Sequence, residues 1–198
     1  MIDASEFSAS DELMHAFDPS DILWNESWFF SWMPADDKPA AFYRLGLLPN
    51  QGRGWLWFYL HNGNEWLCFE ETRLALDHFD TSNGASYDRW ALRFGFKPIE
   101  PLQAAEFFIE GVARVQGGPR SGALVPVRVQ MNMRTTSPCF ATGRKSYSGE
   151  NNRYEKNRFE QSLSVDGSVE FDGKTIPIHC EGHRDRSWGS RQWRSLPS

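Results

Sequence analysis

Residues 127–133 read Val127-Arg128-Val129-Gln130-Met131-Asn132-Met133 and alternate strictly between apolar and polar side chains. In a β-strand, successive side chains point to opposite faces, so every apolar side chain of this run falls on one face. The other face carries an arginine, a glutamine and an asparagine. The stretch therefore predicts a strand that covers a core on one side and meets water on the other.

Similar strand signals recur on both sides of this stretch. Turn residues separate them at intervals of roughly eight to twelve positions, which is typical of an antiparallel sandwich or barrel. Asn62-Gly63 is a strong hairpin signal, and Asp166-Gly167-Ser168 and Asp172-Gly173 indicate two further turns. The strands expected from these signals span residues 41–47, 55–60, 65–72, 89–96, 106–116, 158–165, 169–171 and 174–181. The predicted fold class is therefore all-β and antiparallel.

The N-terminal part of the chain is expected to differ from the rest. Residues 5–18 combine an apolar helix face with acidic residues suited to a first turn, and Pro19 would end the helix. We therefore expect a short N-terminal helical segment within residues 1–22 and a β-domain over residues 23–198. The glycine-rich stretch 117–122 is a possible boundary between two sheets or half-barrels in that domain.

The composition of the 198 residues, 40% hydrophobic and 24% charged, is ordinary for a globular protein. The longest uninterrupted apolar run, Trp55 to Leu60, is too short to cross a bilayer, and the first residues do not have the pattern of a secretory signal. We therefore expect a cytoplasmic protein without stable membrane insertion. Its three widely spaced cysteines are expected to be reduced thiols.

Charge is unevenly distributed along the chain. Residues 1–113 hold 7 basic and 18 acidic residues, a balance of −11, whereas residues 114–198 hold 14 and 8, a balance of +6. A basic half can indicate a nucleic-acid partner, but here the basic residues are scattered and most tryptophans lie in the acidic half. We therefore expect no nucleic-acid partner, and expect the two halves to neutralise each other within the molecule or across a homo-oligomer.

Aromatic side chains make up 15% of the chain, and six of its nine tryptophans lie between Trp24 and Trp66. Such side chains can fill a core or line a cavity for a large apolar ligand, and composition does not separate the two. The chain contains no dinucleotide-binding, Walker-type or nucleophile-elbow motif. In a straight strand, His179 and His183 would lie roughly 13 Å apart, too far to bind the same metal ion, so no metal is expected. Because the cofactor-binding motifs are absent, no cofactor is expected either.

The most chemically versatile stretch is residues 183–188, His-Arg-Asp-Arg-Ser-Trp. In an extended strand, His183 and Asp185 lie on one face, and the two arginines and Trp188 lie on the other. Among aromatic side chains, Asp185 could hold its proton and act as a general acid, and an indole face could stabilise a carbocation. Alternatively, an aspartate between two arginines is a structural hydrogen-bond anchor.

The segment Arg158-Phe159-Glu160-Gln161, the turns at 166–167 and 172–173, and residues 182–193 resemble the carotenoid 1,2-hydratase (hydroxyneurosporene synthase)/AttH-like family. This family also includes fungal lipocalin-like Diels–Alderases. The resemblance implies a lipocalin-like (calycin) barrel that forms the N-terminal half of a two-barrel protein, with an apolar pocket near the junction. The second barrel of the family usually follows this motif and has no counterpart in this chain.

Hydratase members of the family add water to an isoprenoid double bond by acid-initiated protonation, without a cofactor. Their Asp-His-x-Trp motif corresponds here to Asp185, Arg186 and Trp188, with arginine in place of the histidine. The resemblance thus implies a cofactor-independent hydratase, isomerase or cyclase acting on a large apolar, isoprenoid- or steroid-like substrate. The expected catalytic residues are Asp185 and His183. The expected substrate-binding residues are Trp188, Arg186, Trp193, Trp57 and Trp66.

Two other functions are compatible with the same residues. The protein could bind a lipid-like hydrophobic ligand without converting it. It could also be a structural half-domain that needs a partner barrel or a second copy of the chain. Recovery of the ligand unchanged would indicate the first alternative, and an exposed apolar patch beside Trp188 would favour the second.

Overall fold

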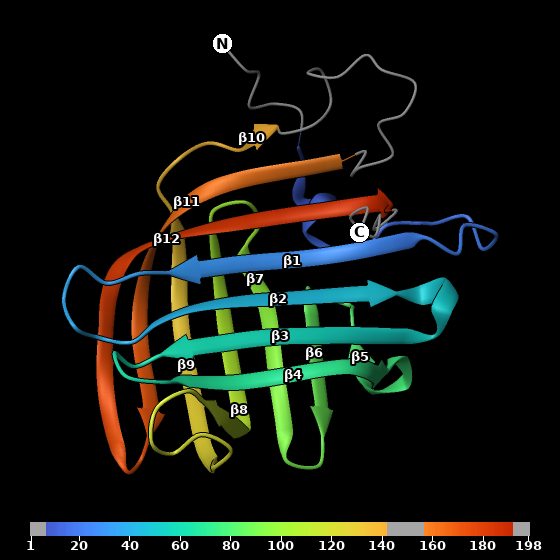
Figure 1. The fold of residues 1–198 in the computed structure, drawn as a ribbon. Helices are drawn as coiled ribbons and strands as arrows, with labels where there is room; N and C mark the ends of the chain where they lie inside the picture. Colours follow the sequence, from blue (N-terminus) through green and yellow to red (C-terminus); the bar gives the residue numbers. More distant parts are fainter. Residues whose placement is uncertain (1–6, 142–156, 192–198) are drawn as a thin grey trace, which may run out of the picture.

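The computed structural model describes residues 7–141 and 157–191, and most of them lie in antiparallel strands (Figure 1). The strands are β1 (Trp24–Trp32), β2 (Ala40–Leu48), β3 (Arg53–His61), β4 (Trp66–Ala75), β5 (Phe79–Asp80), β6 (Ala85–Arg89), β7 (Leu92–Glu100), β8 (Ala104–Gln116), β9 (Leu124–Thr135), β10 (Phe140–Ala141), β11 (Asn157–Phe171) and β12 (Lys174–Ser190). Short 3-10 helices span Ala9–Glu12, Pro49–Gln51 and Leu76–His78. None of the helical turns in the described ranges has the length and apolar character needed to cross a membrane.

The hydrogen-bonded path of the sheet closes on itself. Each strand pairs with the next in the order β11, β12, β1, β2, β3, β4, β8, β9, and β9 pairs back with β11. The contact between β4 and β8 is short and joins Trp66–Cys68 to Arg114–Gln116. The rest of that edge of β8 pairs with β7, which continues into β6 and β5. The prediction of an all-β, antiparallel, lipocalin-like barrel or sandwich is confirmed.

The barrel is flattened into two layers whose strands cross at a steep angle. Figure 1 shows β1–β4 running across the front and β6–β9 running behind them in a nearly perpendicular direction. The long strands β11 and β12 bend from one layer into the other, as strands do at the corners of orthogonal β-packings. Side chains from the two inner faces therefore meet between the layers.

The predicted turn at residues 166–168 is wrong, because β11 continues through them and pairs with β12 and β9. A Cβ at Gly167 would collide with the carbonyl oxygen of Gln130 and would lie 2.8 Å from the Cα of Met131. Gly167 thus marks a close approach of two strands. The turn between β11 and β12 lies at Asp172–Gly173, as predicted, and both residues adopt left-handed backbone angles, φ 50° and 70°.

The core lies between the two layers and is rich in aromatic side chains. The alternation at residues 127–133 is confirmed, because within this run the apolar residues are buried and the polar ones are exposed. Trp28, Phe30, Tyr43 and Phe107 are each at most 2% exposed. The ring of Phe30 lies 4.3 Å from that of Phe107 and 4.5 Å from that of Tyr43. Much of the aromatic content of the sequence therefore fills the barrel.

The N-terminal segment contains less helix than the sequence predicted. Within the described residues 7–22, a 3-10 turn spans Ala9–Glu12, and residues 13–18 are not helical. The carboxylate of Glu12 and the carbonyl oxygen of Leu13 accept hydrogen bonds from arginines of β12. These long-range contacts hold the segment against the barrel in a shape that a regular helix does not provide.

Residues 117–122 connect β8 to β9 as a hairpin loop. The two strands pair continuously from Ala104 with Arg134 to Arg114 with Leu124. The expected sub-boundary therefore does not separate two sheets, because the sheet runs on without a break past this loop.

We expect Gly167→Ala to lower the free energy of unfolding by about 1–3 kcal/mol, because the added methyl group must push strand backbones apart. For a chain of this length, the corresponding fall in Tm is roughly 2–12 °C. Thermal unfolding followed by circular dichroism measures the change. The neighbouring Ser168→Ala, which adds no atom, is the matched control. An unchanged Tm for the glycine variant would contradict the close approach of β11 and β9.

Candidate functional site

The C-terminal part of β12 presents its side chains alternately to the two sides of the sheet. Arg186 lies opposite Trp28 of β1, which belongs to the core. Arg184 and Trp188 have the same parity as Arg186, so all three point into the barrel. The side chains that point outward are those of His183, Asp185 and Ser187.

Arg186 is buried on the inner side of β12, with 1% of its surface exposed. Its guanidinium carbon lies 4.0 Å from the ring centroid of Trp28 and 5.3 Å from that of Trp188, which is a cation–π arrangement. The guanidinium is ion-paired with Glu26, and Nη2 donates to the carbonyl oxygen of Leu13 at 2.6 Å. Burial lowers the pKa of Arg186, and the neighbouring Glu26 charge opposes that shift. Arg186 thus joins β12 to β1 through Glu26 and to the N-terminal segment through Leu13.

Glu26 is the buried partner of Arg186 and is itself tightly bonded. Its carboxylate accepts hydrogen bonds from the backbone N–H of His15 at 3.1 Å and from the indole Nε1 of Trp24 at 3.2 Å. Burial raises the pKa of Glu26, but the hydrogen bond with His15 and the charge of Arg186 more than offset this effect. The net result is a pKa below the ordinary value. The His15 ring also stacks on Trp188, with 4.0 Å between centroids.

A second buried ion pair lies beside the first. Arg184 donates from Nη1 and Nη2 to the two carboxylate oxygens of Glu12, at 3.1 and 2.7 Å. Glu12 also accepts from the backbone N–H of Leu102 at 2.9 Å. Gln161 accepts from Arg184 Nε at 2.9 Å and donates to the carbonyl oxygen of Leu102 at 3.0 Å. This network joins the N-terminal segment, β11, β12 and the turn before β8.

The two residues predicted to be catalytic lie together on the outer face. The Asp185 carboxylate lies 2.6 Å from the guanidinium of Arg158, and 10% of its side chain is exposed. Arg158 also pairs with Glu160 at 2.7 Å, and His183 lies 3.3 Å from the same glutamate. Asp185 and His183 therefore share a charged network, with the sheet between them and the side chain of Trp188.

The predicted tryptophans do not converge on one described pocket. Trp57 and Trp66 lie on the outer face of β3 and β4, with 37% and 40% of their surfaces exposed. Trp188 points into the barrel and packs near Phe7, at 6.4 Å between ring centroids. Trp193 lies outside the described residues.

A shallow apolar site lies on the outer face of β3. From the sequence, Trp57 was expected to bind substrate, but this site was not identified. Arg53, Trp55, Trp57 and Thr72 line a concavity of about 250 Å³, and we call it the Trp55–Trp57 groove. The two indole centroids lie 4.8 Å apart. Trp55 lies across Gly46, where a Cβ would overlap its ring. Strand periodicity alone places residues 53, 55 and 57 on one face, which is the signal that could have identified the site.

A second hollow adjoins the Trp55–Trp57 groove. Its volume is about 620 Å³, and it shares Arg53 and Thr72 with the groove. The residues that complete its lining are Gln51, Gly52, Arg73, Leu74 and Ala75. The two hollows therefore lie on either side of Arg53 and Thr72, and tryptophans line the first and Arg73 lines the second.

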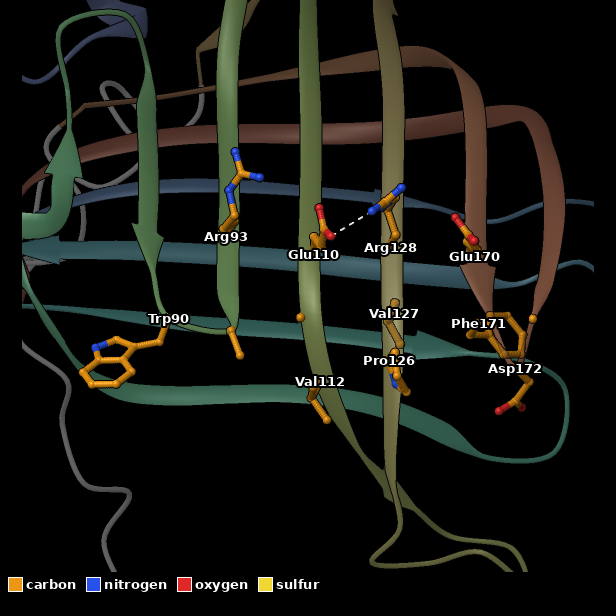
Figure 2. Close-up of a pocket in the computed structure, with 13 residues that line it drawn as sticks. Trp90, Arg93, Glu110, Val112, Pro126, Val127, Arg128, Glu170, Phe171 and Asp172 are labelled. Atoms are coloured by element: carbon orange, nitrogen blue, oxygen red, sulfur yellow. Dashed lines mark hydrogen bonds and ion pairs between the residues drawn. The ribbon is translucent and has the colours of Figure 1, made fainter.

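A hollow of about 460 Å³ lies on the outer face of the other layer (Figure 2). Arg93, Glu110, Arg128 and Glu170 are cross-strand neighbours there and form a ladder of alternating charges. Arg128 lies 2.9 Å from Glu110. Figure 2 shows Trp90 at the rim, and 89% of its surface is exposed. Because opposite charges alternate, the ladder stabilises the sheet and gives a ligand no net charge to recognise.

The described thiols and metal-binding residue types offer no further site. Burial raises the pKa of Cys68 and of Cys139 to about 11, so neither is activated as a thiolate at neutral pH. Within residues 7–141 and 157–191, no group of three or more His, Cys, Asp and Glu could hold a metal ion. His179 is instead paired with Asp166.

Glu26→Gln is expected to lower the free energy of unfolding by about 3–5 kcal/mol at neutral pH, because it leaves the Arg186 charge buried without its partner. The folded pKa of Glu26 lies below its ordinary value of 4.5, so this stabilisation is present above that pH. It is lost as the pH falls through the folded pKa. Urea unfolding at neutral and acidic pH measures the difference between variant and wild type, which should shrink in acid.

The matched control for Glu26→Gln is Glu160→Gln, which removes an ion-pairing carboxylate of which 29% is exposed. We expect a loss of less than about 1 kcal/mol, as is usual for ion pairs in contact with water. Equal losses for the two variants would show that burial of Glu26 does not set the stability of this part of the barrel.

The crystal structure of a putative AttH (NE1406) from Nitrosomonas europaea is similar to this chain, with 14% sequence identity and a TM-score of 0.47. The match covers 90% of this chain and 57% of that one, so this chain spans little more than half the length of that protein. No curated protein sequence matches the chain. The family model of a domain of unknown function, DUF7064, matches residues 8–198. Because this match spans nearly the whole sequence, the protein belongs to the DUF7064 family.

Proposed function

We propose that the protein binds an apolar small molecule in the Trp55–Trp57 groove and releases it chemically unchanged. The observation that carries this proposal is a contrast between the inside and the outside of the barrel. Between the layers, large side chains pack against one another and are almost completely buried. On the outer face, a pair of indoles lines an open concavity of about 250 Å³.

A protein that encloses its ligand needs space between its layers. Here the ring of Trp32 lies 6.1 Å from that of Phe58, which lies 6.1 Å from that of Phe107 on the opposite layer. The buried pair of Arg186 and Glu26 also lies on the inner side of β12 and β1. This packing favours a ligand position on the outer face.

The indole pair is held in position before any ligand arrives. Trp55 is 7% exposed and packs between Gly46 and Trp57, and the guanidinium of Arg44 lies 5.7 Å from its ring centroid. Trp57 remains 37% exposed. Covering such apolar surface contributes about 25 cal/mol per Å². Because the wall is already ordered, less of this gain is lost to immobilising side chains.

The acid-initiated chemistry expected of Asp185 has less support from the geometry. A general acid must hold its proton, whereas an arginine at 2.6 Å favours the charged carboxylate. His183 points to Glu160 at 3.3 Å. Neither residue is on the same side of the sheet as Trp188, the indole expected to stabilise a carbocation.

Naphthylacetamide, an uncharged bicyclic amide, is a suitable probe of the groove. We expect it to bind the wild type, and we expect Trp57→Ala to weaken binding about tenfold, which corresponds to about 1.4 kcal/mol. Isothermal titration calorimetry measures both affinities. Trp90→Ala is the matched control, because Trp90 is 89% exposed in the other layer.

Two outcomes would contradict the proposal. One is equal affinity of the Trp57→Ala variant and the wild type for naphthylacetamide. The other is a wild-type dimer that dissociates in the Trp57→Ala variant without any probe binding. Sedimentation velocity detects the second outcome, which would mean that the indoles pack against another copy of the chain.

Farnesol, an isoprenoid alcohol, distinguishes binding from catalysis. After incubation with the protein, we expect farnesol to be recovered with unchanged mass and chromatographic retention time. A hydrated product would be heavier by one water molecule, and an isomer or cyclised product would shift in retention. A product that forms with the wild type but not with Asp185→Asn would overturn the proposal and establish the acid role of Asp185.

A further inference from the structure

Arg53 stands at one edge of the Trp55–Trp57 groove, and the protein itself fixes its guanidinium. Nε and Nη2 donate to the side-chain oxygen of Gln51 at 3.2 and 3.0 Å, and Nη1 donates to the carbonyl oxygen of Thr72 at 2.9 Å. A guanidinium carries five N–H groups, so Nη1 and Nη2 each keep one that these bonds do not use. Arg53 is therefore oriented in advance and retains hydrogen-bond donors.

Two more arginines lie near the same groove. Arg44 is the cross-strand neighbour of Trp57, and its guanidinium lies 5.7 Å from the ring centroid of Trp55. Arg73 is exposed on β4 and lines the adjoining hollow. Arg53 and Arg73 thus line the two hollows beside the indoles.

The acidic residue nearest to this surface in the strand register is already engaged. Glu70 lies opposite Trp57. Its carboxylate accepts hydrogen bonds from the Tyr59 hydroxyl and from Gln116 Nε2, the latter at 3.2 Å. Arg53 therefore offers unused cationic donors beside the aromatic wall, and Arg73 adds positive charge in the adjoining hollow.

We infer that the ligand of the groove is a monocarboxylate with a flat aromatic or otherwise apolar body. This inference rests on the proposed function and names its ligand class. The body lies against Trp57, and the carboxylate oxygens accept hydrogen bonds from Nη1 and Nη2 of Arg53. Hydrogen bonds of this charged type are roughly twice as strong as neutral ones, and the planar fork of arginine matches a carboxylate.

Size and charge favour a single carboxylate over a polyanion. The concavity of about 250 Å³ accommodates one small ring system beside the indoles. The whole chain carries a net charge of −5, and its first 113 residues hold 18 acidic against 7 basic residues. This field repels multiply charged phosphates more strongly than it repels one carboxylate.

The experiment compares two probes that differ in charge, naphthylacetate and naphthylacetamide, by isothermal titration calorimetry. We expect the wild type to bind the carboxylate at least about tenfold more tightly, because hydrogen bonds to charged groups contribute on that scale. Arg53→Gln should abolish this preference and leave the affinity for the amide within about twofold. Arg73→Gln should weaken only carboxylate binding, by about two- to threefold.

Controls separate ligand recognition from local damage. Arg128→Gln, which removes an exposed arginine from the other layer, should leave the preference unchanged. Because Arg53 also bonds to Gln51 and Thr72, Tm and circular dichroism must match the wild type. Arg53→Lys keeps the charge without the planar fork and should retain part of the preference. Arg73→Gln tests the same charge recognition without disturbing those bonds.

The outcomes distinguish this inference from the proposed function. If naphthylacetamide binds and Trp57→Ala weakens it, but the carboxylate shows no advantage, the ligand class is overturned and the proposed function stands. If neither probe binds, both are overturned. If adenosine monophosphate binds more tightly than naphthylacetate and Arg53→Gln abolishes its binding, the ligand is a nucleotide rather than a monocarboxylate.

Discussion

The inner side of β12 depends on two arginines that are buried together with their glutamates. Arg186 with Glu26 and Arg184 with Glu12 are each nearly or completely shielded from water. Removing such charges from water is costly, and the cost is offset here by bidentate pairing, aromatic faces and several backbone hydrogen bonds. Each pair joins the N-terminal part of the chain to the last strand. The pairing of β1 with β12, one link in the closed path of strands, is therefore reinforced by charged side chains on its inner side.

One strand segment thus serves two different surfaces. Along β12, Arg184, Arg186 and Trp188 face inward and bind the N-terminal segment, whereas Asp185 and His183 face outward. An Asp-Arg-Ser-Trp sequence suggests a compact catalytic group when it is read as a string of neighbours. In a strand, successive side chains point to opposite sides of the sheet, so Asp185 and Trp188, three positions apart, lie on different sides. The aspartate and the indole therefore cannot act on the same small substrate atom.

The parts of the fold that were predictable are those in which local pattern and tertiary environment agree. The alternation in residues 127–133 identified β9 because one face of that strand is buried and the other is exposed. The turn assigned to Gly167 was wrong because that glycine accommodates the backbone of β9, which no local pattern reveals. The helix predicted within residues 5–18 was too long because Glu12 bonds to an arginine 172 positions away. Odd and even positions showed which site residues share a face of the strand. They did not show which of the two faces points into the barrel.

On the outer face, a row of cross-strand neighbours connects the Trp55–Trp57 groove to Asp185. Trp57, Arg44, Phe29 and Asp185 are successive cross-strand neighbours on β3, β2, β1 and β12. Three strand spacings separate the first from the last, roughly 14 Å. A ligand with one small ring system, held between Trp57 and Arg53, does not reach the carboxylate of Asp185. An extended chain that lies along this row could contact both. For the ligand proposed here, length therefore sets whether it would stay within the groove or extend along this row towards Asp185.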